Sequence, residues 1–199
     1  MELLVIRHAL PLRVENPEGE PADPALSELG LRQAERLAHW LRDEPIDGIY
    51  ASPLCRAHQT AIPLAEAKGL PIQLEPGVVE FDPTAASYVP LEELKATDYD
   101  AWRELVQGGF YAQIDFGLFR RTVVSSVESI IAANQGKRIA IVCHGGVINS
   151  WVGHILGIED PLFFDPTYTS INRCLAARTG ERMVVSLNEA AHVRELATP

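Results

Sequence analysis

Residues 3–8 read Leu-Leu-Val-Ile-Arg-His, an apolar run of strand character that delivers an arginine and a histidine at its end. The design recurs twice, because residues 49–56 read IYASPLCR and residues 139–146 read IAIVCHGG. An arginine offers paired planar donors to phosphate, and a histidine offers a nitrogen nucleophile. The chain has a net charge of −10, so potential cations at the ends of predicted buried strands indicate a local binding partner of negative charge. A bound phosphate is the simplest one.

The composition is that of a soluble globular protein of 199 residues, 47% hydrophobic, which predicts one domain with a well-buried core. The excess of 27 acidic over 17 basic residues disfavours nucleic acid and anionic membranes as partners. Apolar stretches are too short to span a bilayer, and no cationic, apolar leader precedes the first strand. Three scattered cysteines fit a reducing compartment. We therefore expect a cytoplasmic protein.

Strand-like runs alternate with helical patterns along the chain. Strands are predicted near residues 2–6, 47–51, 72–75, 138–143, 171–178 and 182–187, and helices over about 28–41, 54–68, 118–134 and 145–155. The first helix is expected to begin after Ser27 and to bury Leu31, Ala34, Leu37, Ala38 and Leu41. This alternation predicts an α/β fold, a three-layer α/β/α sandwich with a mostly parallel sheet. Because Thr179-Gly180 separates the last two runs as a hairpin turn would, at least one strand should be antiparallel.

Two stretches lack periodicity. Residues 9–26 hold four prolines and four acidic residues, and we expect a loop over the end of the first strand. Residues 76–117 are irregular and rich in aromatic side chains, which favours either a substrate-facing lid or an ordinary packed excursion. The prediction is a single domain over residues 1–199 with a lid-like insertion around 76–117.

Four potential cations follow the carboxyl ends of predicted strands: Arg7, His8, Arg56 and His144. Ligands of open α/β sheets bind outside these ends, so neighbouring strands would bring the four side chains together. Taken singly, each has an ordinary structural explanation, such as a hydrogen-bonded histidine or a solvated arginine. Four coincidences together favour a functional site.

Four segments carry a resemblance to a known family: LLVIRHA, LSELGLRQAERLA, YASPLCRAHQTA and IVCHGGVI. In their order and spacing they resemble the histidine phosphatase superfamily, also called the phosphoglycerate mutase-like family. The resemblance covers most of the first 150 residues and implies a phosphoglycerate mutase-like fold. It also implies that His8 attacks phosphorus in line and forms a phosphohistidine that water then cleaves.

The resemblance assigns further roles around that nucleophile. Arg7, Arg56 and His144 would hold the phosphoryl oxygens, and Gly145 would let backbone amides approach the anion. Many family members have a glycine after the Arg-His pair and an asparagine shortly beyond, whereas here Ala9 follows and the asparagine contact is in doubt. Arg13 is a candidate replacement donor, with a solvent-facing loop arginine as the alternative.

A leaving alkoxide needs a proton, and the family position implies Glu80 as its donor. The neighbours Val79 and Phe81 are apolar, so burial would raise the pKa of Glu80 toward neutrality. Asp82 is the rival, because alternation along a strand would put both carboxyl groups on one face. The sequence leaves this choice open, with the motif favouring Glu80.

The sequence lacks the motifs of other hydrolase, metal and nucleotide-binding chemistries. No arginine lies six positions after Cys55 or Cys143, as a cysteine-dependent phosphatase requires. The chain contains no Gly-x-Ser-x-Gly, His-Glu-x-x-His, Cys-x-x-Cys, P-loop or Gly-x-Gly-x-x-Gly motif, so we expect neither a metal nor a nucleotide cofactor. The remaining histidines, His39, His58, His154 and His192, are expected to have no chemical role.

The sequence thus predicts a metal-independent phosphomonoester hydrolase that acts on a small phosphorylated metabolite. A phosphoglycerate mutase is the first alternative, although residues 76–117 contain only Lys95 and Arg103 as cations to grip a substrate carboxylate. A catalytically silent phospho-ligand binding or scaffold domain is the second. A homodimer through the exposed edge of residues 183–187 is a further expectation.

Overall fold

Apolar residues of strand β1 (Glu2–Arg7) point alternately into two cores, one on each face of a sheet. Leu3 and Val5 pack into the core on one side, while Leu4 and Ile6 pack into the core on the other. A strand that is buried on both faces must lie inside the sheet. The computed structural model describes residues 1–15, 19–100, 102–103 and 114–196.

The sheet contains six strands in the order β4-β3-β6-β1-β7-β8. Its strands are β1, β3 (Gly48–Ala51), β4 (Ile72–Leu74), β6 (Arg138–Cys143), β7 (Ile171–Ala176) and β8 (Arg182–Glu189). The pairs β1–β6, β3–β6 and β3–β4 are parallel, whereas β7 is antiparallel to both β1 and β8. The predicted antiparallel hairpin at the end of the chain is confirmed.

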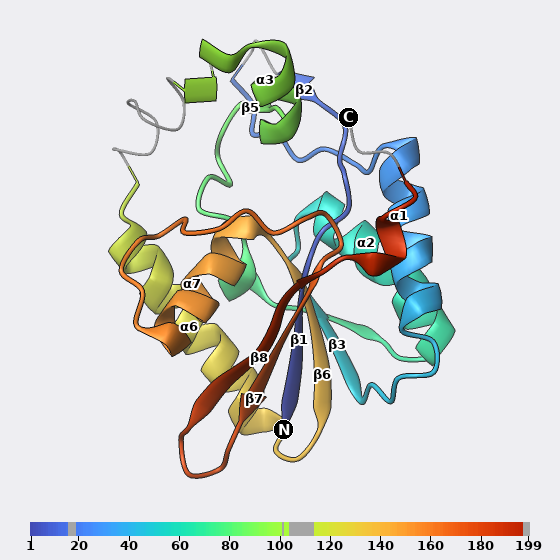
Figure 1. Cartoon of the computed structure of the whole chain (residues 1–199), viewed down its shortest axis with the longest axis vertical. Helices are drawn as coiled ribbons and strands as arrows, with labels where there is room; N and C mark the ends of the chain where they lie inside the picture. Colours follow the sequence, from blue (N-terminus) through green and yellow to red (C-terminus); the bar gives the residue numbers. More distant parts are fainter. Residues whose placement is uncertain (16–18, 101, 104–113, 197–199) are drawn as a thin grey trace.

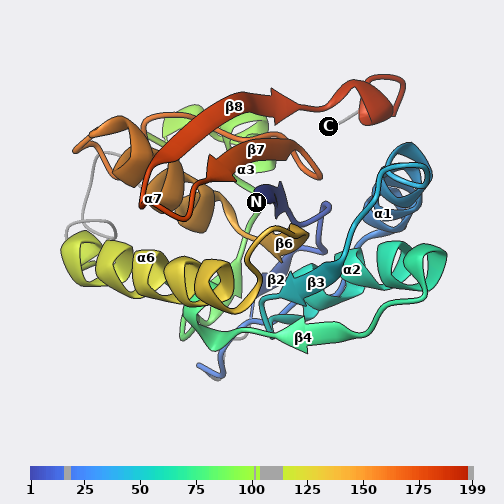
Figure 2. The same cartoon turned by 90° about the horizontal axis from the view of Figure 1, so that it is seen from below.

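Helices cover both faces of the sheet, as Figures 1 and 2 show. Helices α1 (Glu28–Trp40) and α2 (Cys55–Lys68) enclose one core, and α6 (Phe116–Ala133) and α7 (Gly145–Leu156) enclose the other. The three-layer α/β/α prediction is therefore confirmed.

One expected core residue of α1 is exposed. Leu31 has 50% of its surface exposed, while Gly30 and Gln33 are buried. A Cβ atom at Gly30 would lie only 2.0 Å from the carbonyl oxygen of Leu10, so the loop after β1 packs directly on the helix backbone. That contact turns the buried face of the first helical turn away from Leu31.

The loop after β1 and the segment after β4 cross the carboxyl ends of the parallel strands (Figure 1). The short strands β2 (Val14–Glu15) and β5 (Ser87–Tyr88) pair antiparallel, which joins the two segments. The described part of residues 76–117 also contains the 3₁₀ turn η1 (Pro76–Val78) and helix α3 (Leu91–Thr97), and a second such turn, η2 (Ala191–Val193), follows β8. Phe110 and Tyr111, which contributed to the lid prediction, lie outside the described residues. The single domain with a lid-like insertion stays a prediction.

Candidate active site

Strand order brings the predicted cations together. Because β6 lies between β1 and β3, the three strands end side by side, with Arg7 paired to Cys143 and Ala51 to Val142. His8 and His144 come one residue after two of these ends, and their ring centroids are 5.1 Å apart. Arg56, in the first turn of α2, acts electrostatically on both imidazoles together with Arg7. All four side chains are buried.

His8 has the protonation state that a nucleophile needs. Its Nδ1 lies 2.8 Å from the carbonyl oxygen of Ala9, and since a carbonyl only accepts, Nδ1 carries the hydrogen and Nε2 keeps its lone pair. Burial, then the charges of Arg56 and Arg7, hold the pKa of His8 well below 6.5. The neutral imidazole with a free Nε2 is therefore the stable form at neutral pH.

The backbone around His8 is fixed by polar side chains from two helices. The amide of Ala9 donates to Thr60 Oγ1 at 2.9 Å, and the hydroxyl of Thr60 donates to the carbonyl of Arg56. The amide of Leu10 donates to Gln33 Oε1 at 2.9 Å. The loop that carries the imidazole is thus joined to both α1 and α2, which restricts where Nε2 can point.

His144 is held by a residue that the sequence analysis did not single out. Its Nε2 lies 2.8 Å from the hydroxyl of Ser52, which is fully buried after β3. Its Nδ1 is buried and has no hydrogen-bond partner among the described residues. When the Ser52 hydroxyl donates to Nε2, Nδ1 carries the hydrogen and can donate to an anion. Burial and the nearby Arg56 lower the pKa of His144, which keeps it neutral.

The two arginines are each packed against an aromatic ring. The guanidinium carbon of Arg7 lies 3.9 Å from the ring centroid of Tyr168, and that of Arg56 lies 4.7 Å from the ring centroid of Tyr88. Arg56 also has a carboxylate oxygen of Asp23 at 3.9 Å. A planar guanidinium that is stacked in this way presents its N–H donors in a fixed direction, as paired recognition of phosphate oxygens requires.

The carboxyl group of Glu80 has the surroundings expected of a proton donor. Its Oε2 accepts from the amide of Gly146 at 3.1 Å, and its Oε1 accepts from the amide of Phe81 at 3.2 Å. Burial, then repulsion from Asp82, raises the pKa of Glu80 to about 7. Burial also raises the pKa of Asp82, with the charge of Arg56 opposing it. Glu80 can therefore hold a proton near neutrality, which favours it over Asp82 as the donor.

Arg13 and Gly145 were further candidates for contacts with the anion. Arg13 is exposed, immediately before β2, which suits the solvent-facing alternative. Gly145 begins α7, and a Cβ atom there would meet nothing within 4 Å. The amide of Gly146 donates to Oε2 of Glu80, and the role of Gly145 toward the anion stays a prediction.

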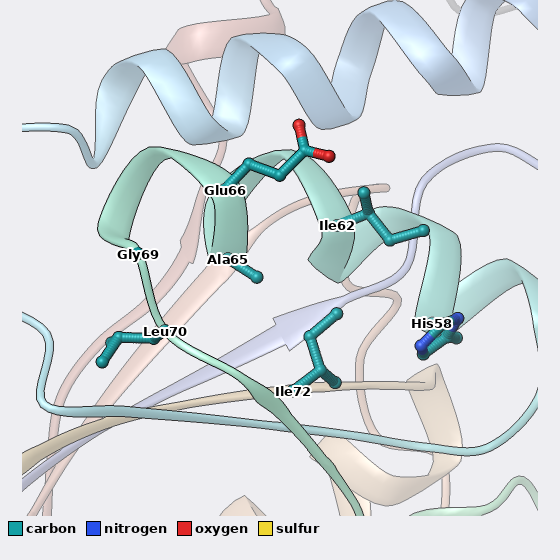
Figure 3. A pocket seen from close by; sticks show the side chains of 7 residues that line it. All are labelled: His58, Ile62, Ala65, Glu66, Gly69, Leu70 and Ile72. Atoms are coloured by element: carbon teal, nitrogen blue, oxygen red, sulfur yellow. The ribbon is translucent and has the colours of Figure 1, made fainter.

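Among the hollows of the described residues, two are lined by none of Arg7, His8, Arg56 and His144. One is bounded by η1, the Glu80 segment and the start of α6, and it has Glu80 and Phe81 in its wall. The other lies on the side of α2 away from Arg56, against β4, and its lining is mostly apolar (Figure 3): His58, Ile62, Ala65, Glu66, Gly69, Leu70 and Ile72. Only the first hollow includes a residue of the site.

Within the described residues, no three His, Cys, Asp or Glu side chains are grouped so that they could hold a metal ion. A search of the same residues finds no helix that is long and apolar enough to cross a membrane.

Comparison with known proteins identifies the family. A family model described as "Histidine phosphatase superfamily (branch 1)" matches residues 3–190. The chain belongs to the histidine phosphatase superfamily. This membership confirms the resemblance in the four segments and the predicted class of enzyme, a phosphatase.

The chain resembles relatives of two activities. It is 27% identical to phosphoserine phosphatase 1 of Hydrogenobacter thermophilus, over 98% of this chain and 95% of the relative. It is 26% identical to the probable phosphoglycerate mutase GpmB of Yersinia pestis, over 79% of this chain and 76% of the relative.

Solved structures show the same fold. A mutant phosphoserine phosphatase of Entamoeba histolytica in complex with phosphoserine superimposes with a TM-score of 0.73, at 22% identity, over 96% of this chain and 98% of that one. YhfR of Bacillus stearothermophilus superimposes with a TM-score of 0.75, at 20% identity, over 97% and 99%. The phosphoglycerate mutase-like fold that the resemblance implied is confirmed.

Proposed function

We propose that this histidine phosphatase is a metal-independent phosphomonoester hydrolase that acts on a small phosphorylated metabolite through a phosphohistidine at His8. The observation that carries the proposal is the neutral, buried His8 imidazole, with Nδ1 bonded to the Ala9 carbonyl and Nε2 left as a lone-pair donor. Two buried arginines and a second neutral histidine beside it supply donors for a dianion. This arrangement supports nucleophilic attack on phosphorus.

In the first step, Nε2 of His8 forms a bond to phosphorus while the bond from phosphorus to the ester oxygen breaks. Arg7, Arg56 and His144 stabilise the charge on the equatorial oxygens. The leaving alkoxide takes the proton of Glu80, whose pKa of about 7 lets it hold that proton at neutral pH.

In the second step, water attacks the phosphohistidine and the nitrogen–phosphorus bond breaks. The Glu80 carboxylate, now deprotonated, accepts a proton from the water, and inorganic phosphate leaves. His8 returns to its neutral form with Nδ1 still bonded to the Ala9 carbonyl.

The contacts of Lys95 and Arg103, the two cations of residues 76–117, favour hydrolysis over mutase activity. Lys95 lies over the ring of Trp102 at 4.7 Å, and Arg103 forms an ion pair with Asp100 at 3.1 Å. Both cations of residues 76–117 thus have partners within that segment, which reduces their capacity to grip a substrate carboxylate. The mutase-like relatives keep the alternative in view, and the phosphoserine phosphatase relative makes phosphoserine the first substrate to test.

The test is a kinetic screen of phosphate esters with the wild type and the variant His8→Ala. The panel includes phosphoserine, sugar phosphates, an aryl phosphate, and 3-phosphoglycerate with and without 2,3-bisphosphoglycerate. We expect phosphate release from one or more esters, with a loss of about 10³-fold or more in the variant. Transfer to 3-phosphoglycerate in preference to water would establish the mutase alternative. Tight phosphate binding without turnover of any ester would establish the scaffold alternative.

We also propose that two copies associate through β8, the last strand of the sheet. Its outer face carries Met183 and Val185, which are 55% and 53% exposed. An apolar strand with an unpaired edge is suited to pairing with another strand. Light scattering of the wild type and of Met183→Glu tests this, since only the wild type should dimerise. We further assign the enzyme to the cytoplasm, which its three free cysteines support.

A further inference from the structure

The segment between α7 and β7 contains a strained residue next to the site. Thr169 has φ of +59°, a left-handed conformation that a β-branched residue rarely adopts. Its buried amide donates to the carbonyls of Arg7 and His8, at 3.1 and 3.3 Å. Backbone strain of this kind persists only where surrounding contacts impose it, and it is concentrated at functional sites. Here it couples residues 165–170 to the end of β1.

That conformation puts the neighbouring ring beneath the phosphate-binding cation. Tyr168 is 2% exposed, and its ring centroid lies 3.9 Å from the guanidinium carbon of Arg7. The same ring lies 5.7 Å from the ring centroid of His8. Nη1 of Arg7 donates to the carbonyl of Pro166 and lies 3.4 Å from Asp165. Residues 165–168 therefore contact the Arg7 guanidinium twice: the ring of Tyr168 lies against its face, and Pro166 and Asp165 contact its edge.

The C-terminal segment holds the other side of Thr169. The hydroxyl of Thr169 donates to the carbonyl of Tyr168 at 2.7 Å. Nε2 of His192 lies 3.1 Å from the hydroxyl oxygen of Thr169. Because the single hydroxyl hydrogen goes to the carbonyl, the Nε2–H of His192 is the donor in the second contact. His192 belongs to η2 and contacts the ring of Trp40 in α1. The segment is thus fixed between β1 and the C-terminal turn.

We propose that Tyr168 is a positioning residue for Arg7: its ring acts as a rigid platform that directs the guanidinium donors at the phosphoryl group. An arginine side chain has many rotamers, and a stack on a buried aromatic face removes most of them before substrate arrives. The ring, not the hydroxyl, supplies this function. The proposal rests on the proposed function only in that Arg7 binds the phosphoryl group.

The experiment is a double-mutant cycle between the two residues, with an aromatic and an aliphatic replacement of the ring. Inorganic phosphate affinity is measured by calorimetry, and kcat and KM are measured on an aryl phosphate. We expect Tyr168→Phe to stay within about twofold of the wild type and Tyr168→Leu to lose about tenfold in phosphate affinity, with the loss appearing mainly in KM. In an Arg7→Ala background, Tyr168→Leu should cost less than about twofold.

Several outcomes would overturn the proposal. Equal losses from Tyr168→Leu in the wild-type and Arg7→Ala backgrounds would show that the ring acts independently of Arg7. Equal losses from the Phe and Leu variants would assign the effect to the hydroxyl or to general destabilisation. If the Leu variant fails to fold, the pair Tyr168→Met and Tyr168→Trp makes the same comparison, because only Trp retains an aromatic face.

Tyr50 provides the matched control for loss of a tyrosine. It lies in β3 and its hydroxyl accepts from the side-chain amide of Asn134 at 3.0 Å. Tyr50→Leu should lower stability without changing phosphate affinity. Because the calorimetric arm needs no turnover, a wild type that binds phosphate without hydrolysing any ester would count against the proposed function while leaving the coupling of Tyr168 to Arg7 measurable.

Discussion

At the scale of single residues, two opposite pKa shifts in one site set up the chemistry. Burial and two guanidinium groups lower the pKa of His8, and burial with a neighbouring carboxylate raises the pKa of Glu80. The nucleophile and the acid that we propose are therefore both in their active forms, neutral His8 and protonated Glu80, over a range that extends below neutral pH. The same burial acts on both groups, and its effect differs in sign because it disfavours the cation of one and the anion of the other.

The Glu80 shift predicts a pH profile. Glu80 donates only while protonated, so kcat/KM for alkyl phosphates should fall as pH rises above about 7. Glu80→Gln should lose about 100-fold on alkyl phosphates and should no longer show that fall. An activated aryloxide leaves without a proton, so kcat/KM for aryl phosphates, which reports formation of the phosphohistidine, should be little affected. Steady-state kinetics on matched alkyl and aryl esters measure both effects, and equal losses in kcat/KM on the two esters would refute the acid role.

At the scale of elements, the start of α7 determines where the acid sits. A Cβ atom at Gly146 would lie 2.3 Å from Oε1 of Glu80 and 2.6 Å from Cδ1 of Phe81. The absence of a side chain here therefore gives the Glu80 segment its place against the helix. Gly146 thus serves to place the Glu80 carboxyl group against the helix.

Gly146→Ala should therefore displace Glu80 while sparing the fold. We expect a loss of about tenfold in kcat/KM for alkyl phosphates and a smaller loss for aryl phosphates. In the double variant with Glu80→Gln, the second change should add little, since both act through one carboxyl group. Losses that multiply in the double variant would contradict this account of Gly146.

Element by element, the sequence was most informative where structure is regular. Each apolar run ending in a cation became a strand, and the shared edge of parallel neighbours brought Arg7, His8 and His144 together as expected. The irregular segments were not predictable in the same way. Ser52 and Tyr168 join the site through loop geometry and a left-handed backbone, which have no periodic pattern in the sequence. Leu31 was misplaced because a close contact at Gly30, a long-range effect, decides which face of α1 is buried.

At the scale of the whole molecule, the buried neutral histidine links catalysis to folding. The pKa of His8 lies well below its ordinary value of 6.5, so below pH 6.5 the unfolded chain binds a proton there that the folded chain does not. The stability contributed by neutral His8 is present above that pH and is lost as pH falls toward the folded-state pKa.

His8→Gln should therefore flatten the pH dependence of the free energy of unfolding. Relative to the wild type, its slope below pH 6.5 should be smaller, by at most about 1.4 kcal/mol per pH unit. Urea titrations across that range measure the difference. His39→Gln, at an exposed position of α1, is the matched control for the loss of an imidazole. An unchanged slope in His8→Gln would mean that His8 is not held neutral by the fold.

The covalent intermediate is the central claim, and intact-protein mass spectrometry after rapid quench at alkaline pH tests it most directly. The account predicts that wild-type enzyme mixed with a turned-over ester gains one phosphoryl group, located on His8 by peptide fragmentation, and that His8→Ala gains none. The adduct should accumulate further in Glu80→Gln when an aryl ester supplies the phosphoryl group, because its hydrolysis lacks the base. Turnover with no adduct at His8, or an adduct on another residue that persists in His8→Ala, would contradict the account.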